Sequence, residues 1–510
     1  MNKKQFVINM TSNITAFAVN VIMSFFLTPY LIKILGKEAY SFYPLANNFV
    51  EYANIFAIAF NSVASRYVSI EIHRGNTEKA NKYFNSILFS NIIIGLICAL
   101  FSLVIIWNLE NLINIPPEIT TDVKILFAFV FMNFIINLSS VALGICTTVR
   151  NRLELTSLRK MESTFVKMVV TFGLLFIFSP RISYVGIGAF IATVFVLITN
   201  FIYTKKLLPE IKVSYKSFKF KYARKILTSG IWNSFNQLGE LLFSGLNIML
   251  ANLLVSVSDA GNVSIARTVP SFMITLTATI VAVFVPTILK TYAVGTKKEL
   301  AEILRSSSTI TATIINLPLA IFLALGKEFY ALWVPGEDIN TIYYITIVLI
   351  VPIMVNSSIS SLKNVFIALN KFKIPALTLC ACGVCSVALS VISVKLFPVL
   401  GVFGIVITSS TIRILYNLLF SVNYVSRLLE IKAHKLYFTI FKSILYTAVV
   451  FISGVFFTKL VNINSWFMLF VSGAVLCIWG LGISLVLILK KSDRDMIFAT
   501  IKNKLKKGKK

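Results

Sequence analysis

Residues 84–107, FNSILFSNIIIGLICALFSLVIIW, form an apolar run that contains no Asp, Glu, Lys or Arg. A helix rises 1.5 Å per residue, so a run of this length crosses a hydrocarbon core of about 30 Å. Similar runs recur along the chain of 510 residues, of which 57% are hydrophobic and only 13% charged. Soluble proteins carry about 25% charged residues. The sequence therefore predicts an all-α polytopic membrane protein, and it excludes a soluble enzyme, a disordered chain and a secreted disulfide scaffold.

The apolar runs fit fourteen transmembrane helices. Their predicted ranges are 8–33, 41–66, 84–107, 121–146, 162–180, 184–204, 227–255, 262–289, 306–331, 339–364, 376–396, 400–424, 438–459 and 465–489. The first run lacks a convincing cleavage site, so we expect it to be retained as a span. The loops between spans are too short to hold a folded domain with its own core, which excludes catalysis on an extramembrane domain.

The formal net charge of +28 comes from 48 Lys and Arg against 20 Asp and Glu, and most of the basic residues fall in the termini and in the loops of one side. The positive-inside rule makes that side cytoplasmic. An even number of spans then places both termini in the cytoplasm. We expect the protein in the cytoplasmic membrane. The basic tail would lie against anionic lipid headgroups. Because no groove-reading module accompanies the charge, nucleic acid is not an expected partner.

Short motifs of the first half of the chain recur in the second half, across a basic linker. The motif Gly186-Ile187-Gly188-Ala189 with Thr193 opens the sixth span, and Gly401-Val402-Phe403-Gly404 with Thr408 opens the twelfth at the same offsets. Six spans per half give both halves the same orientation, related by a parallel pseudo-two-fold axis, as in some transporters. Chance similarity between short apolar strings is the alternative. The predicted domains are an N-terminal lobe at 1–204, a cytoplasmic linker at 205–226, a C-terminal lobe at 227–424, spans 13 and 14 at 425–489, and a cytoplasmic tail at 490–510.

Polar side chains recur at helical spacing in the first two spans of each half. These stripes are Asn9, Asn13, Asn20, Ser24 and Thr28; Asn47, Glu51, Asn54, Asn61 and Ser65; Ser229, Asn233, Asn236, Glu240, Ser244 and Asn247; and Ser264, Arg267, Ser271 and Thr275. Polar groups in hydrocarbon are costly and normally face a bundle interior or a wet cavity. Interhelical hydrogen bonding in a packed bundle is the alternative. Because the stripes are rich in Asn and Glu and include ionisable groups, we favour a hydrated cavity.

Four ionisable residues accompany the stripes. Glu51 and Glu240 are the deepest acids, and each could pair with an arginine, couple transport to an ion, or touch substrate. A guanidinium offers a planar fork that suits phosphate, so Arg66 and Arg267 are candidates for holding an anionic headgroup. Arg66 could instead snorkel to the interface. The predicted substrate-binding residues are Arg66, Arg267, Asn54, Asn61, Asn233, Asn236 and Asn247, with Glu51 and Glu240 as candidates for ion coupling.

No residues group into a catalytic, metal or cofactor site in the sequence. Cys380, Cys382 and Cys385 have a metal-like spacing, but they fall in the middle of a span with no histidine near, so packing of small residues is preferred. No phosphate-binding loop is present, so direct ATP drive is not expected. We therefore expect no enzyme activity, no metal and no cofactor.

Three segments carry a family resemblance. They are TPYLIKILGKEAY at 28–40, NSVASRY at 61–67 with the charged loop HRGNTEKA at 73–80, and NVFIALNK at 364–371. On these segments the chain resembles, over residues 5–490, the polysaccharide flippases of the multidrug/oligosaccharidyl-lipid/polysaccharide exporter superfamily. Members of this family translocate precursors of O-antigen and capsule.

The resemblance implies two six-helix lobes that form a V, with spans 1, 2, 7 and 8 lining a central cavity. It implies alternating access that moves an undecaprenyl-pyrophosphate-linked saccharide from the inner to the outer leaflet of the bacterial cytoplasmic membrane. Arg66 and Arg267 are the positions that could receive the pyrophosphate. The implied partners are this lipid-linked saccharide, membrane lipids, and a polysaccharide polymerase and glycosyltransferases of the same pathway.

Two other functions compete with the flippase. The first is a cation-coupled small-molecule or drug exporter on the same scaffold, which the absence of an acidic residue from the first span disfavours. The second is an integral-membrane glycosyltransferase or ligase, which would need a large external loop or a convergent acid/base cluster. The residues do not separate teichoic-acid or capsule precursors from O-antigen precursors.

Overall fold

The computed structural model of the protein describes residues 3–294, 296–369 and 371–488, and these residues contain helices and no strand. This confirms the predicted all-α class. The longer helices of the first half are α1 (Lys3–Leu35), α2 (Lys37–His73), α3 (Thr77–Trp107), α5 (Thr120–Leu143), α7 (Leu153–Ile177) and α8 (Ser183–Leu207). Those of the second half are α9 (Phe220–Glu240), α12 (Thr268–Val294), α13 (Lys297–Trp333), α14 (Ile339–Ser360), α16 (Lys373–Leu396), α17 (Val402–Leu415), α19 (Ala433–Leu460) and α20 (Trp466–Leu487).

Shorter helical segments extend or break several of these helices. They are α4 (Leu109–Leu112), α6 (Ile145–Val149), α10 (Asn247–Leu254), α11 (Val257–Ala266), α15 (Asn364–Ala368) and α18 (Asn423–Leu429), with π-helical turns η3 (Leu241–Gly245) and η5 (Tyr416–Val422). Three-residue 3₁₀ turns are η1 (Pro117–Ile119), η2 (Tyr215–Ser217) and η4 (Pro398–Leu400). The two π-helical turns fall within predicted spans 7 and 12, and such turns are frequent at functional sites.

Twelve helices among the described residues are long and apolar enough to cross a membrane. Residues Phe220–Gly245 and Asn247–Leu254, which are bent by 42° at their junction, raise the number to as many as thirteen. The predicted count of fourteen is therefore not confirmed. The difference is predicted span 162–180, which corresponds to α7. This helix carries Arg159, Lys160, Glu162 and Lys167, so its first half is too charged for a simple span.

Local sequence signals explain where several helices begin. Gly36 separates α1 from α2 with a φ of 83°, a conformation that favours glycine. The Asn76 side chain accepts a hydrogen bond from the backbone of Lys79 and caps α3. Thr296 and Glu299 form a capping box that begins α13. These caps satisfy backbone N–H groups that helix starts leave unpaired.

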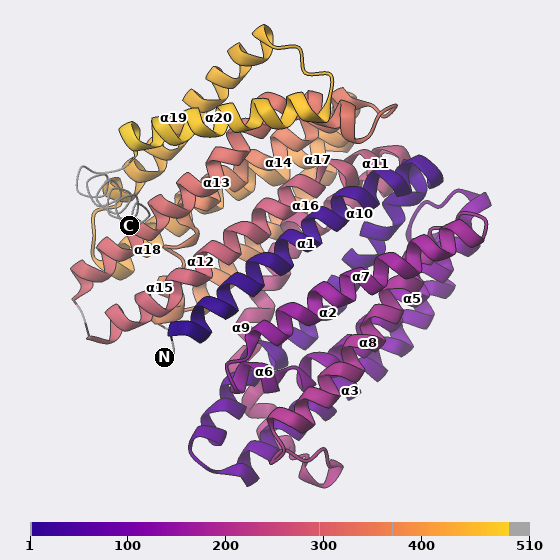
Figure 1. Cartoon of the computed structure of the whole chain (residues 1–510), viewed down its shortest axis with the longest axis vertical. Helices are drawn as coiled ribbons and strands as arrows, with labels where there is room; N and C mark the ends of the chain where they lie inside the picture. The colour runs from indigo at the N-terminus through magenta and orange to yellow at the C-terminus, as the bar shows by residue number, and fades with distance from the viewer. Residues whose placement is uncertain (1–2, 295, 370, 489–510) are drawn as a thin grey trace, which may run out of the picture. The chain divides into compact units, whose positions relative to one another are not determined.

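The first compact unit comprises Met1–Ile265 and Phe372–Ser409. Within it α5 packs against α8 and α3, α2 against α3 and α9, and α7 against α8 and α1 (Figure 1). α16 packs against α9. The largest side chains buried near the basic loops of this unit include Tyr83, Phe84 and Ile87. On the outer face of α3, Leu100 and Phe101 are exposed, as expected for side chains that contact lipid.

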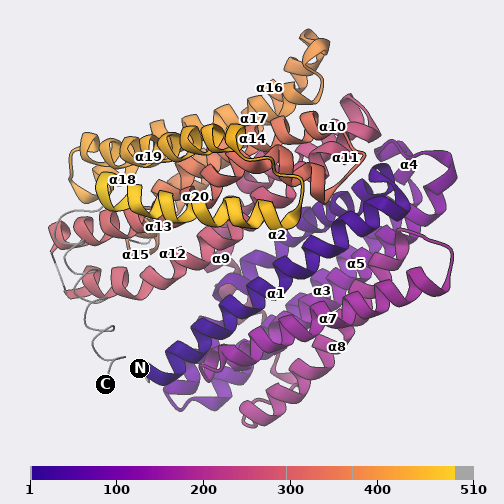
Figure 2. The same cartoon turned by 45° about the horizontal axis from the view of Figure 1, so that its top comes forward.

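The second compact unit comprises Ala266–Lys371 and Ser410–Lys510. α13 is its central helix and packs against α12, α14, α19 and α20, which run beside it in Figure 2. Buried Ile315, Leu319 and Ile350 form one part of the core between α13 and α14. Buried Tyr446 and Val450 of α19 form another part with Leu317.

The compact units follow contacts, whereas the predicted lobes follow the internal repeat. The contacts group α9, α10 and α16 with the helices of the first half. The division into lobes at 1–204 and 227–424 therefore stays a prediction.

Candidate substrate site

The helices that carry the polar stripes predicted for spans 2 and 7 pack against each other in the first unit, along an interface between α2 and α9. The Asn233 side-chain amide donates to the Ser62 hydroxyl at 3.0 Å. The Ser234 hydroxyl donates to the Ile55 carbonyl at 2.6 Å. Further along, the Gln237 amide donates to the Glu51 carboxylate at 3.4 Å. The stripe residues Asn233 and Glu51 thus bond across the interface to partners outside the stripes, which is interhelical packing of the kind the alternative describes.

A glycine lets the two helices approach at the start of this α2–α9 interface. The backbone of Gly230 lies against the main chain of α2, and a Cβ there would overlap the Ala59 carbonyl oxygen. Further contacts join the helices on both sides of Gly230 along the interface. The Tyr67 hydroxyl lies 2.8 Å from that of Ser229, and the Tyr52 hydroxyl donates to the Gly245 carbonyl at 3.1 Å. The structure thus shows α2 in close contact with α9 and η3 between Glu51 and Tyr67.

The other predicted asparagines have different surroundings. Asn61 accepts a hydrogen bond at 2.8 Å from Asn91 of α3, and Asn91 also bonds the Leu138 carbonyl. Asn54 is half-buried and Asn236 is exposed. Asn247 is buried and donates to the Ser409 hydroxyl at 3.3 Å. Asn61 of α2 bonds toward α3, whereas Asn233 of α9 bonds to Ser62 of α2. The two asparagines therefore belong to separate hydrogen-bond networks.

The predicted ionisable residues divide between the two units. Arg66 is exposed on α2. Arg267 lies in the second unit, at the break between α11 and α12, where its carbonyl accepts from the Ser271 hydroxyl at 2.8 Å. Glu51 and Glu240 are half-buried on α2 and α9. A shared role of the two arginines in holding one anion stays a prediction.

A polar cavity of about 460 Å³ lies inside the first unit, among α2, α5, α6, α7 and α8. We call it the N-terminal polar cavity. Its lining residues are Asn61, Ala64, Ser65, Asn137, Ser140, Val141, Gly144, Ile145, Thr147, Thr148, Leu153, Thr156, Arg159, Lys160, Ser163, Thr193, Val196 and Asn200. Arg159 and Lys160 are the cations among these residues, and no carboxylate is among them. Asn61 is the predicted site residue that the cavity includes.

Arg159 is held firmly at the wall of this cavity. Its guanidinium donates to the Tyr203 hydroxyl at 3.1 Å and lies 4.9 Å from the centre of that ring. It also forms an ion pair of 3.2 Å with Glu162, one turn further along α7. Within the described part of the chain its buried Nε has no hydrogen-bond partner. The contacts with Tyr203 and Glu162 thus fix the guanidinium at the cavity wall.

Arg159 and Lys160 are not among the predicted site residues. Predicted span 5 begins at residue 162, so the apolar pattern assigns both residues to a basic loop. The signal that could have found them is the charge of the segment itself. Arg159, Lys160 and Glu162 follow one another within four positions of α7, where a simple loop–span boundary would place charges only at the end.

Other polar groups within the spans have structural partners. Lys167 donates to the Tyr43 hydroxyl at 2.6 Å. In the second unit Lys363 donates to Asn356 at 2.9 Å and to Asn417 of η5 at 3.1 Å. The Cys380 thiol donates to the Phe235 carbonyl at 2.8 Å, a contact that ties α16 to α9. No group of three or more His, Cys, Asp or Glu in the described ranges could hold a metal ion.

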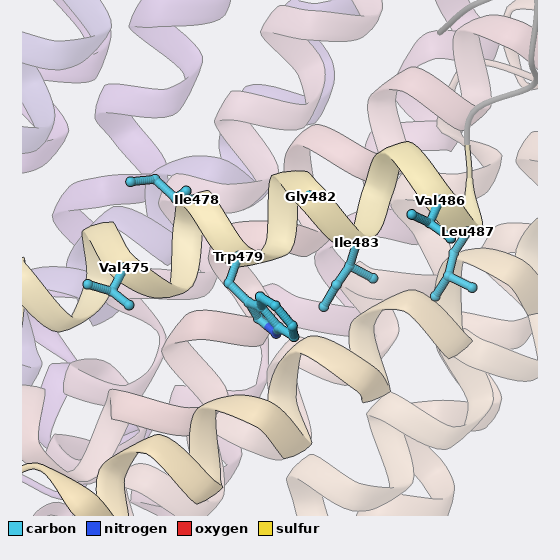
Figure 3. Close-up of a pocket in the computed structure, with 7 residues that line it drawn as sticks. All are labelled: Val475, Ile478, Trp479, Gly482, Ile483, Val486 and Leu487. Carbon is cyan, nitrogen blue, oxygen red and sulfur yellow. The ribbon is translucent and has the colours of Figure 1, made fainter.

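The second unit has an apolar hollow of about 590 Å³ along one face of α20. Figure 3 shows its lining residues, which all come from that helix, with the ring of Trp479 projecting from it. Its lining residues are Val475, Ile478, Trp479, Gly482, Ile483, Val486 and Leu487. With no charged group in its lining, this hollow suits hydrocarbon chains and offers nothing to a phosphate or a sugar.

The fold is one that solved structures of multidrug transporters and lipid flippases share. Among solved structures, the lipid II flippase MurJ in an inward closed conformation matches with a TM-score of 0.67 and 14% identity, covering 94% of this chain and 98% of that one. An inward-facing multidrug-resistance transporter of the same superfamily matches with a TM-score of 0.61 and 14% identity, covering 83% of this chain and 98% of that one. At this identity the matches show the fold.

The family follows from the sequence. The model of the polysaccharide biosynthesis protein family matches residues 6–292, more than half of the chain, so the protein belongs to that family. A relative in Bacillus subtilis (strain 168), the uncharacterized membrane protein EpsK, is 27% identical over 430 residues, covering 84% of this chain and 85% of EpsK. The resemblance to polysaccharide flippases is confirmed. With twelve or thirteen candidate spans among its described residues, the chain is a multi-pass membrane protein of this family.

Proposed function

We propose that the protein is a lipid-linked oligosaccharide flippase. It moves undecaprenyl-pyrophosphate-linked saccharide units from the inner to the outer leaflet of the bacterial cytoplasmic membrane, for cell-surface polysaccharide such as O-antigen, capsule or teichoic polymer. The observation that carries this proposal is the match to the polysaccharide biosynthesis family on a chain with the fold of a lipid II flippase. A charged and hydroxylated headgroup cannot cross hydrocarbon unaided, and this chain supplies polar helices to receive one.

Alternating access between two lobes is the proposed mechanism, with residues 1–204 and 227–424 as the lobes and both termini in the cytoplasm. Arg66 and Arg267 hold the pyrophosphate in this mechanism. Asn54, Asn61, Asn233, Asn236 and Asn247 donate to saccharide hydroxyls in this mechanism. Glu51 and Glu240 couple the movement to an ion. A polysaccharide polymerase and glycosyltransferases of the same pathway act before and after the flipping step.

A cation-coupled small-molecule exporter is the second candidate, because multidrug transporters are among the structural neighbours. The described part of α1 argues against it, since its sequence from Lys3 to Leu35 contains no acidic residue. An exporter of this type needs a carboxylate for its cation, and here that would have to come from α2 or α9.

Depletion in the native host tests the proposal. Lipid-linked oligosaccharides are extracted and measured by mass spectrometry, together with the surface polymer. The flippase predicts accumulation of one complete polyprenyl-pyrophosphate saccharide and loss of the matching polymer. Unchanged precursor and polymer, in a strain without a second flippase gene, would favour the exporter, and drug susceptibility would then be measured.

A further inference from the structure

The N-terminal polar cavity has an excess of positive charge. Arg159 and Lys160 face it without a carboxylate in its lining. Glu162 forms an ion pair with Arg159 and neutralises its charge in part, but Glu162 does not line the cavity. Uncompensated cations within a helical bundle raise the local potential and attract anions. The cavity is therefore built to hold a negative group.

The neutral residues of the cavity offer hydrogen bonds in several directions. Asn137, Thr148, Ser163 and Thr193 add amide and hydroxyl groups from four helical segments. Thr147 and Thr156 are already bonded to each other at 2.8 Å. Such a lining suits a ligand with several hydroxyl groups. The volume of about 460 Å³ falls within the usual range of small-molecule sites, about 300–1,000 Å³.

The cavity is located at the end of the first unit that carries basic residues. Arg150 and Arg152 flank the turn between α6 and α7, and Lys205 and Lys206 end α8. The positive-inside rule makes this the cytoplasmic end. A ligand made in the cytoplasm, or attached to a lipid of the inner leaflet, would meet the cavity before it reached the middle of the membrane.

We propose that the N-terminal polar cavity binds a phosphorylated saccharide before translocation. Lys160 and the guanidinium of Arg159 bind the phosphate, and the Asn, Ser and Thr side chains bind the sugar hydroxyls. This proposal rests on the proposed function and adds to it an entry site distinct from the residues of the α2–α9 interface. The ligand chemistry is shared by a lipid-linked saccharide and by a soluble sugar phosphate, so the experiment includes both.

The test measures binding to the full-length protein in nanodiscs of phosphatidylcholine. The probes are farnesyl-pyrophosphoryl-N-acetylglucosamine, N-acetylglucosamine 1-phosphate and the uncharged octyl N-acetylglucosaminide. Lys160→Gln removes an exposed cation of the cavity, and Lys206→Gln removes an exposed lysine outside it. Loss of one charged hydrogen bond weakens binding about tenfold. We expect this loss for the charged probes in Lys160→Gln only, and no change for the uncharged probe.

A second variant does not change charge. Ser163→Trp fills the cavity, and it should abolish binding of both charged probes while the protein remains monodisperse. Dependence on Lys160 with the farnesyl probe alone identifies a lipid-linked ligand, whereas dependence with both probes identifies the saccharide phosphate itself. Equal competition by phosphatidylglycerol would overturn the proposal, because the cavity would then recognise any anionic phospholipid.

Flipping measured in the same preparations separates the two proposals. Unchanged affinity in both variants, with normal flipping of lipid-linked saccharide by the wild-type protein, would overturn the entry site and leave the flippase standing. Absence of both binding and flipping in the wild-type protein would overturn the entry site together with the proposed function.

Discussion

Individual side chains decide which of two explanations holds for Arg66. An arginine that binds pyrophosphate uses its planar fork, whereas an arginine that snorkels uses only its charge and reach. Arg66→Lys keeps the charge and loses the fork, so flipping of lipid-linked saccharide should fall about tenfold if Arg66 binds phosphate. Arg74→Lys, at the exposed end of α2 beside Glu71, is the matched control. Normal flipping by Arg66→Lys would assign Arg66 to the membrane interface.

The two carboxylates are a second prediction at the residue scale. If Glu51 and Glu240 couple flipping to an ion, the double variant Glu51→Gln, Glu240→Gln should lose flipping about tenfold or more, because an amide cannot take up and release a proton. Glutamine keeps the size of the side chain and can still pair with Gln237. The measurement is flipping in proteoliposomes with and without an ion gradient. Gradient-driven flipping at the wild-type rate would remove both residues from the mechanism.

For single residues, the sequence predicts which of them share a helix face. It does not predict whether that face contacts another helix or a cavity. Their spacing predicts Glu51 and Asn233 on polar stripes, and the structure places these two residues in one interface. A wet cavity and a hydrogen-bonded interface require the same residue types at the same spacing, so spacing alone does not separate them. Arg159 could not be predicted as a site residue for another reason: a count of charges assigns every cation near a span boundary to a loop.

Among the helices, the α2–α9 interface depends on Gly230. A methyl group there would overlap the Ala59 carbonyl, which is backbone and cannot move aside cheaply. Gly230→Ala should therefore disfavour the closed interface by about 1–3 kcal/mol, although alanine itself favours helix. The readout is disulfide formation between cysteines at positions 62 and 233, where the native side chains are 3.0 Å apart. We expect a lower yield in Gly230→Ala and less flipping.

The control for this prediction is Gly173→Ala on α7. A Cβ at Gly173 meets nothing within 4 Å, so this change adds the same methyl group to a helix without a close neighbour. Its disulfide yield and its flipping should equal those of the parent protein. An undiminished yield in Gly230→Ala would show that α2 and α9 adjust to the methyl group, and the glycine would then have no special part in closure.

Most helices could be predicted from their apolar runs, and the exceptions have physical causes. The run at 84–107 became α3, whose described end at Trp107 matches the prediction. α7 is too charged to count as a simple span, because it borders the N-terminal polar cavity. The π-helical turns η3 and η5 were not predicted, since a change from i→i+4 to i→i+5 bonding leaves no marker in the apolar pattern.

For the whole molecule, the internal repeat and the observed contacts divide the chain differently. The repeat predicts lobes at 1–204 and 227–424, and the contacts join α9 and α16 to the first-half helices. The two divisions agree if the α2–α9 interface is a contact that forms in one state and breaks in another. In that case the compact units defined by contacts describe a closed state. The lobes defined by the repeat are then the bodies that move.

This explanation leads to a prediction about transport. A disulfide between Ser62→Cys and Asn233→Cys, made in a background in which the six native cysteines are replaced, would keep the α2–α9 interface closed. If opening of this interface is a step in flipping, oxidation should stop flipping and a reductant should restore it. Translocation of a saccharide headgroup needs polar residues such as Asn233 and Glu51 to exchange their hydrogen bonds across the α2–α9 interface for bonds with the cargo.

A disulfide that does not link the two predicted lobes provides the control. Asn316 of α13 and Ser443 of α19 are 3.0 Å apart at their side chains, and both side chains are buried. A disulfide between Asn316→Cys and Ser443→Cys should leave flipping unchanged, because it does not join the predicted lobe at 1–204 to the predicted lobe at 227–424. If both disulfides leave flipping unchanged, the α2–α9 interface is a permanent contact, and the cargo must pass elsewhere. If only the first one stops flipping, the polar stripes are a gate that opens for the cargo.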